Sequence, residues 1–234
     1  MRPIKRLREL LSSHASVYKD FAHHYDMVYF GRIFAGDDDQ RIIQGVTVSA
    51  QHKDEHYCVG TIHGYDVVLV ERTDTLRRPN STKTEKYSWQ IMQFDLKSNY
   101  DHPHVFIDGK HHDEVFYQTL FIKFARLTRV DNSLLGGRDS RFIKCFSAYT
   151  PPDAIDDLPL LLTSERAEMM AHHFSHLDFE WFQDRLIIYS VSGTPTMHLL
   201  DHMLRAGYWL ASELDAATNT KNTPDSAGVD TEIN

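Results

Sequence analysis

The chain has 234 residues, of which 41% are apolar and 25% are charged, and its formal charge at pH 7 is −8. These values are close to those of ordinary globular proteins, so they exclude a wholly disordered or fibrous chain. The acidic balance also argues against a general nucleic-acid binder, which is usually basic.

Residues 3–24 are predicted to form an amphipathic helix that packs on the core. Lys5, Arg6 and Arg8 leave an alternative open, in which the helix contacts an anionic membrane surface, although three charges are a weak signal for that. The prediction rests on apolar side chains at helical spacing, which are Ile4, Leu7, Leu11, Tyr18, Phe21 and Tyr25.

From residue 26 to about residue 108 the pattern changes to short runs rich in β-branched and aromatic residues. His63-Gly64 separates two of these runs, which is typical of a β-hairpin. Short links between successive runs favour a mostly antiparallel sheet. We expect strands at residues 27–30, 41–49, 56–63, 65–72, 87–95 and 104–107.

The second half mixes helices and strands. The period of residues 113–126 is ambiguous and fits a short helix followed by a strand. We predict a strand at 142–149, a helix from Thr163 or Ser164 to about His176, and a hairpin of 178–182 with 185–190. Thr194-Pro195 is expected to open a last helix that ends near Asp215.

The domain prediction follows from these elements. Residues 1–216 should form one α+β domain, a mostly antiparallel sheet with long N-terminal and C-terminal helices packed on it. Residues 217–234 are almost devoid of apolar side chains, so we predict a disordered polar tail.

Two cysteines, Cys58 and Cys145, are too few for a disulfide framework and are expected to be free thiols buried in strands. The sequence shows no secretory signal and no apolar run of the roughly 20 residues that span a membrane, which favours a cytoplasmic protein. Phosphate-binding, dinucleotide-binding and nucleophile-elbow motifs are also absent from the sequence. We therefore predict no cofactor and no catalytic residue.

Histidine pairs are the best metal candidates. His172 with His176, and His198 with His202, are each one helical turn apart, a spacing that zinc can use. Both pairs lie off the apolar stripe of their helices, so solvated helix faces are the competing interpretation. A second polar cluster fits either a loop rim or a metal or general-base site, and it contains His102, His104, His111, His112, Asp113 and Glu114.

Two further features have alternative interpretations. Asp95 and Lys97 have the Asp-x-Lys spacing of some metal-dependent nucleases, although the acidic chain argues against that activity. Trp209 lies opposite Leu200 and Leu204 on the last helix and is a candidate interface residue, with a second copy as the expected partner. Otherwise the helix is buried on both faces, or Trp209 lies under the first helix.

Residues 142–191 resemble a bacterial domain family of unknown function. The resemblance is carried by the run 142–150, the helix start Leu160-Leu161-Leu162-Thr163-Ser164 and the hairpin 181–189, with a similar strand upstream at 65–71. Ser164 stands where that family tends to have Pro, and the membrane-spanning helices with which its members often begin are not seen here. The resemblance implies an α+β fold, and since the family has no established activity it implies no catalytic residue.

The sequence thus favours a non-catalytic binding or scaffold protein whose partner is another protein or a second copy. A metal-dependent hydrolase that uses the histidine-rich positions is the alternative.

Overall fold

The computed structural model describes residues 14–32, 43–49, 51–77, 82–98, 100–110, 116–117, 121, 124, 126–135, 140–191 and 194–221. In these residues nine strands form one sheet, in the order β1-β2-β3-β4-β9-β8-β5-β7-β6, and every neighbouring pair is antiparallel. The strands are β1 Val28–Arg32, β2 Lys53–Ile62, β3 Tyr65–Arg77, β4 Thr84–Asp95, β5 His102–Asp108, β6 Thr128–Arg129, β7 Ser147–Thr150, β8 Asp178–Gln183 and β9 Arg185–Ser190.

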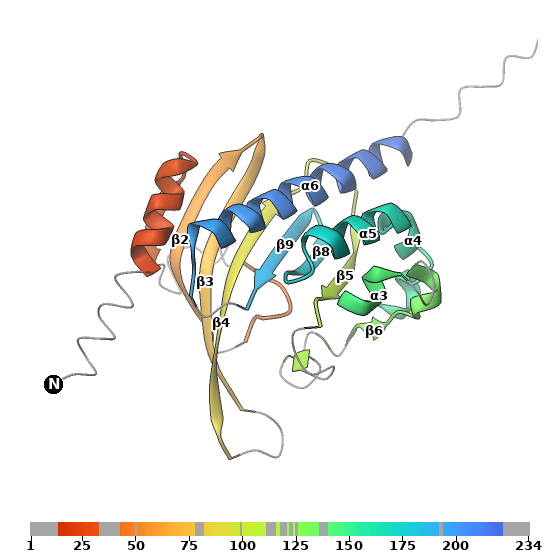
Figure 1. Cartoon of the computed structure of the whole chain (residues 1–234), viewed down its shortest axis with the longest axis horizontal. Coiled ribbons are helices and arrows are strands. Elements are labelled where there is room, and N and C mark those ends of the chain that lie inside the picture. Colours follow the sequence, from red (N-terminus) through yellow and green to blue (C-terminus); the bar gives the residue numbers. More distant parts are fainter. Residues whose placement is uncertain are drawn as a thin grey trace, which may run out of the picture.

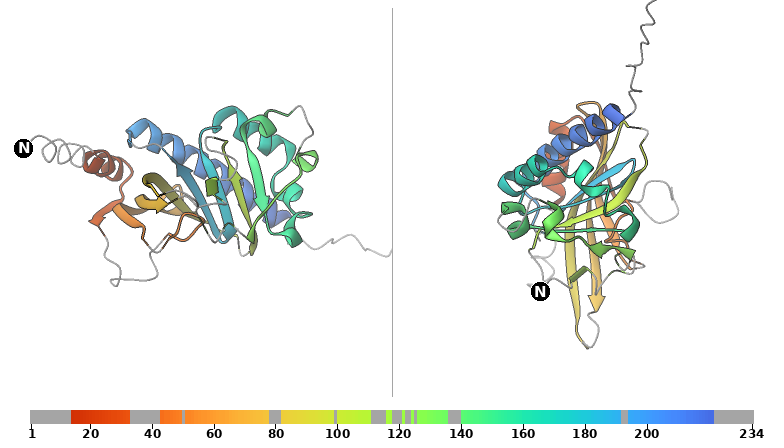
Figure 2. Two further views of the ribbon diagram at one scale, coloured as in Figure 1. Left: turned by 90° about the horizontal axis from the view of Figure 1, so that it is seen from below. Right: turned by 90° about the vertical axis from the view of Figure 1, so that its right-hand side faces the viewer.

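The helices gather on one face of this sheet (Figures 1 and 2). The predicted α+β class is therefore confirmed. The helices are an N-terminal helix over residues 14–24, α3 Arg141–Cys145, α4 Leu158–Leu161, α5 Ser164–His173 and α6 Met197–Lys221, with short 3₁₀ turns η3 Asn132–Leu135 and η4 Pro152–Ala154.

The first of the two cores lies between the helices and the sheet. Leu200, Leu204 and Leu214 of α6 are buried in it, as the helical spacing predicts. Gly207 brings α6 close to the sheet, since a Cβ atom at this position would lie 2.0 Å from the ring of Phe94. None of the described helices is long and apolar enough to span a membrane.

The second core covers part of the opposite face and is rich in aromatic side chains, which include Trp89, Phe106, Tyr117, Phe124, Tyr149 and Tyr189. Residues 43–49 are held onto this face by polar contacts. Glu180 is fully buried and accepts hydrogen bonds from the Val46 backbone N–H, at 3.0 Å, and from the Tyr189 hydroxyl. Gly45 has φ +115°, and a Cβ there would lie 2.8 Å from Glu180 Oε2, so only glycine fits this approach.

Local turn signals are confirmed. His63 and Gly64 have φ of 51° and 79°, as a two-residue hairpin turn requires, and they join β2 to β3. β8 and β9 form the hairpin predicted around Gln183-Asp184. Thr163 is the N-cap of α5, and its hydroxyl accepts the Arg166 N–H.

Several predicted elements differ in the structure. Residues 142–149 do not form one strand, because Ser140 caps the short helix α3 and strand β7 begins only at Ser147. Cys145 therefore lies at a helix end and is half-buried, whereas Cys58 is buried in β2 as predicted. The described part of 41–49 is a turn rather than a strand. The last helix begins at Met197, where Thr196 accepts the Leu199 N–H, and not at Thr194-Pro195.

Both chain ends also depart from expectation. The described helical residues near the N-terminus are 14–24, and the rest of the predicted helix lies outside the described residues. Helix α6 continues through the expected boundary at 216 to Lys221, and Thr218 is buried with its hydroxyl donating to the Asp215 carbonyl. Residues 222–234 lie outside the described residues.

Candidate functional site

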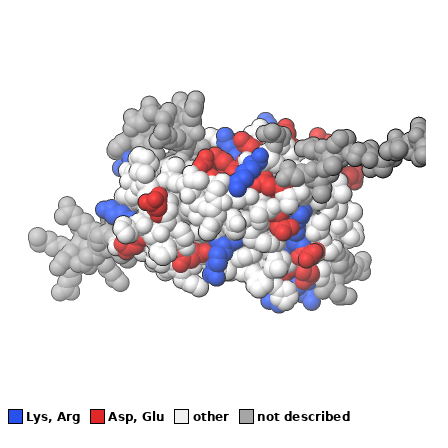
Figure 3. All heavy atoms as spheres, turned by 90° about the horizontal axis from the view of Figure 1, so that it is seen from above, with Lys and Arg blue, Asp and Glu red and all other residues white. Residues whose placement is uncertain are grey.

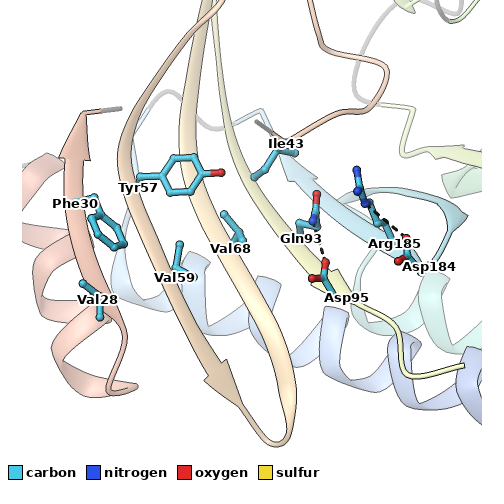
Figure 4. A pocket seen from close by; sticks show the side chains of 10 residues that line it. All are labelled: Val28, Phe30, Ile43, Tyr57, Val59, Val68, Gln93, Asp95, Asp184 and Arg185. Carbon is cyan, nitrogen blue, oxygen red and sulfur yellow. Dashed lines mark hydrogen bonds and ion pairs between the residues drawn. The ribbon is translucent and has the colours of Figure 1, made fainter. Parts of the chain in front are cut away.

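A groove crosses the face of the sheet that points away from the helices (Figure 4). Its floor is a row of direct cross-strand neighbours, in which Val28 opposes Val59, Val59 opposes Val68, and Val68 opposes Gln93. Direct partners project to the same side of a sheet, so the pairing itself assembles the floor. The hollow has a volume of about 400 Å³, and its apolar lining consists of Val28, Phe30, Ile43, Tyr57, Val59 and Val68.

The edge strand β1 leaves large apolar side chains open to solvent. Val28 is 57% exposed and Phe30 is 48% exposed, and both line the groove. A contiguous exposed apolar surface next to a hollow is typical of a binding site rather than of ordinary protein surface.

The other end of the groove is polar. Gln93 Nε2 donates to Asp95 Oδ1 at 3.0 Å, and Arg185 Nε lies 3.6 Å from Asp184 Oδ1 (Figure 4). Partial burial raises the pKa of the Asp95 carboxyl, and the charges of Asp184 and Asp66 add to that, whereas the Gln93 amide and Arg185 oppose it. The groove therefore has an apolar body and a polar end.

Asp95 is thus at a ligand-sized hollow, but not in a nuclease-type arrangement. Lys97 Nζ lies 4.0 Å from the ring centroid of Tyr65, which belongs to the core under the helices. Asp95 faces the groove on the opposite side of the sheet. The Asp-x-Lys pattern does not bring the two side chains to one site.

A different polar cluster, centred on Glu71, lies under the N-terminal helix. Glu71 is 6% exposed and accepts hydrogen bonds from Ser88 Oγ at 3.2 Å and from His14 Nδ1 at 3.1 Å. His56 Nε2 lies 3.8 Å from the same carboxylate, and burial lowers the pKa of His56, against the opposing charge of Glu71. These contacts join the helix to β2, β3 and β4.

The predicted histidine pairs are partly brought together. The ring of His176 stacks on that of His202 with centroids 4.6 Å apart, and the His198 centroid is 6.4 Å from His202. His172 lies elsewhere, with Nδ1 3.3 Å from Arg141 Nη1. Burial lowers the pKa of His202, and the neighbouring His176 and Arg205 add to that shift.

No metal-binding geometry results from this proximity. In the part of the chain that the structure describes, no three His, Cys, Asp or Glu side chains are placed to hold a metal ion. The polar cluster predicted at residues 102–114 is described only in part. His104 Nε2 pairs with Glu180 Oε1 at 2.6 Å and His102 is buried, while residues 111–114 lie outside the described residues.

Treatment with a chelator is therefore expected to leave the melting temperature unchanged, because no three potential ligands among the described residues are placed to hold a structural metal ion. Removing a structural zinc costs many kcal/mol, so such a loss would be plain in thermal unfolding followed before and after incubation with EDTA and dialysis. A fall of more than a few degrees would restore His176, His198 and His202 as metal ligands.

Trp209 packs inward more than its position on the helical wheel predicts. It is half-buried against the first core, and its ring stacks on Phe174 with centroids 5.7 Å apart. Helix α6 is thus covered on this side by the residue that ends α5. The interface role of Trp209 stays a prediction.

One buried carboxyl on the face of the sheet away from the helices gives the stability a pH dependence. Asp108 is 4% exposed, and burial, aided by the nearby Asp178, raises its pKa to about 7, against Lys110 and Arg129. A carboxyl whose pKa is higher in the folded than in the unfolded state binds its proton on folding, so the contribution of Asp108 to the stability rises as the pH falls from 8 toward 4.

Asp108→Asn should remove this contribution, which is on the order of 2 kcal/mol between pH 8 and pH 5. We expect the free energy of unfolding of the variant, measured in urea, to change less between these pH values than that of the wild type. Equal changes in the two proteins would contradict the raised pKa.

On the face drawn in Figure 3, Lys and Arg are interspersed with Asp and Glu, and neither sign forms a continuous area among the described residues. This face therefore shows no charged patch, and the groove is the candidate site considered below.

Sequence reasoning did not predict the groove. The one available signal was the run Val67-Val68-Leu69-Val70 in β3. Because successive side chains of a strand point to opposite faces, this run places apolar side chains on both faces of the sheet, which indicates that both faces are packed against something.

Comparison with known proteins supports the fold. The crystal structure of the mycobacterial trehalose monomycolate transport factor A, TtfA, matches 88% of this chain and 94% of its own, with a TM-score of 0.58 and 13% sequence identity. At this identity the match shows a shared fold and nothing more. No family model and no curated protein matches the chain, so the resemblance to a bacterial domain family stays an expectation.

Proposed function

We propose that the chain is a non-catalytic binding protein that holds a molecule with an apolar body in the groove between β1 and β4. The carrying observation is the row Val28, Val59 and Val68, which presents an apolar floor beside the exposed ring of Phe30. A volume of about 400 Å³ suits a small molecule, since typical ligand sites measure roughly 300–1,000 Å³.

A binding role fits the rest of the site. The groove combines one polar end with apolar walls, which fixes the orientation of a bound molecule. The similarly folded mycobacterial protein is named a trehalose monomycolate transport factor, but the proposal for this chain rests on its own groove. The alternative, a metal-dependent hydrolase, lacks a three-ligand group among the described residues.

Binding of the neutral dye Nile red tests this proposal, with Phe30→Ser as the variant and Leu160→Ser as the matched control. Both residues are large, apolar and exposed, at 48% and 54%, but Leu160 lies on α4, away from the groove. Losing the Phe30 ring should remove about 1–2 kcal/mol of apolar contact, which weakens binding roughly five- to thirtyfold.

We expect the wild type and Leu160→Ser to bind the dye saturably with equal affinity, while Phe30→Ser binds it more weakly at an unchanged melting temperature. No saturable binding by the wild type, or equal affinity of all three proteins, would refute the proposal.

A further inference from the structure

The floor of the groove is a straight track that crosses the strands. Val28, Val59 and Val68 are direct cross-strand neighbours, and Gln93 continues the row on β4. Neighbouring strands lie about 4.8 Å apart, so the row from β1 to β4 is roughly 14 Å long. All three apolar positions carry the same short side chain, which keeps this floor even.

The residues beside the row limit its width. Phe30, Tyr57 and Ile43 form a second apolar row along one side (Figure 4). On the other side Thr61 pairs directly with Asp66, and Thr61 Oγ1 donates to Asp66 Oδ1 at 2.7 Å. Rows two residues apart on a strand are separated by roughly 7 Å, and side chains take up part of that distance. The apolar wall and the polar rim therefore leave a space one alkyl chain wide over the valines.

The two ends of the track differ. At β4 the row meets Ile187 of β9, which is fully buried, so the open floor ends there. Asp184 and Arg185 line the groove at this end and carry opposite charges. At the other end β1 is the edge strand of the sheet, and Val28 is 57% exposed. The polar head of a ligand therefore belongs at β4, and its apolar end at β1.

We infer that the groove takes amphipathic molecules with one unbranched alkyl chain, which lies across the strands with its head at the β4 end and its last carbons at Val28. This inference rests on the proposed function and names the ligand class of the same site. A C–C bond of about 1.5 Å advances an extended chain by about 1.3 Å, so a track of roughly 14 Å takes about eleven carbons. Carbons within this length contact the valines, and those beyond it pass the edge of β1 into water.

A homologous series of single-chain ligands measures this length. We would titrate the protein with n-alkylphosphocholines of 6, 8, 10, 12 and 14 carbons, whose head group has no net charge, each below its micelle-forming concentration. Isothermal titration calorimetry should show the affinity rising about four- to fifteenfold with each added pair of methylenes up to 10 carbons. Between 12 and 14 carbons it should change less than about twofold.

Val28→Thr and Val68→Thr locate the chain, because both replace one methyl group by a hydroxyl of similar size. Val28→Thr should weaken binding of the 12-carbon ligand and leave that of the 6-carbon ligand unchanged, since only the longer chain reaches β1. Val68→Thr should weaken both ligands by a similar factor. Leu160→Ser, on α4 and outside the groove, should behave as the wild type does.

An affinity that keeps rising to 14 carbons, or one that is independent of chain length, would overturn the inference. Equal effects of Val28→Thr on the 6- and 12-carbon ligands would overturn it as well. So would binding to phosphatidylcholine vesicles without binding of the monomeric ligands, because the exposed valines would then contact a membrane surface. Nile red binding without alkylphosphocholine binding would remove this inference alone, whereas the absence of saturable dye binding would remove the proposed function.

Discussion

Replacing Arg72 by leucine is expected to lower the free energy of unfolding by about 3–5 kcal/mol. The Arg72 side chain is fully buried, and its Nε and Nη2 donate to the two carboxylate oxygens of Asp54 at 2.8 and 2.7 Å. It also donates to the Ile43 carbonyl at 2.7 Å and to Thr47 Oγ1 at 3.2 Å. Removing it deprives these acceptors of their donor and takes away two of the contacts that hold residues 43–49 on the sheet.

Urea unfolding measures this loss, and Arg32→Leu is the matched control. Arg32 pairs with Glu55 at 3.6 Å, but its side chain is 49% exposed, and such surface pairs contribute at most about 1 kcal/mol. Arg72→Lys should recover little, because an ammonium cannot reproduce the two-pronged contact with Asp54. Equal losses in Arg72→Leu and Arg32→Leu would show that the buried contacts contribute no more than a surface pair.

Arg72 also bears on the proposed site. Ile43 lines the groove, and Arg72 holds its backbone carbonyl. We therefore expect Arg72→Leu to weaken Nile red binding under conditions where the protein is still folded.

The second large effect is expected at Gly207, where alanine should destabilise the protein by about 3 kcal/mol. Helix propensity alone predicts the opposite, since alanine is favoured over glycine by about 1 kcal/mol within a helix. The added Cβ would lie 2.0 to 2.8 Å from three ring atoms of Phe94, which is 1% exposed and cannot move aside without disturbing the core.

A double-mutant cycle distinguishes a collision from other effects. Phe94→Leu shortens the side chain under α6, so Gly207→Ala should cost less in that background than in the wild type. Arg205→Ala, at an exposed position on the same helix, should have little effect. A higher melting temperature in Gly207→Ala would mean that α6 does not lie as close to β4 as the structure places it.

Structural features that depend on residues close together in the sequence were predicted correctly. His63-Gly64 reverses the chain because glycine and histidine tolerate the left-handed conformation that a tight hairpin needs. Thr163 starts α5 because its hydroxyl accepts a free N–H of the first turn. The buried stripe of α6 follows from helical periodicity, which any helix packed on one side must show.

Predictions failed where tertiary contacts decide between local alternatives. Residues 142–146 are predicted to be extended, but Phe142 in helix α3 and Phe146, the residue that caps its C-terminus, both pack into the core, and the Phe146 N–H donates to the Phe142 carbonyl. Residues 43–49 resemble a strand in composition, yet side chains bond two of their backbone groups in place of a neighbouring strand: Arg72 donates to the Ile43 carbonyl, and Glu180 accepts the Val46 N–H.

By itself the sequence determined the α+β class, the hairpins and the buried face of the last helix, because each depends on side chains near one another along the chain. The groove depends on the tertiary structure. Val28, Val59, Val68 and Gln93 come from four strands, and only the register of those strands places them in one row.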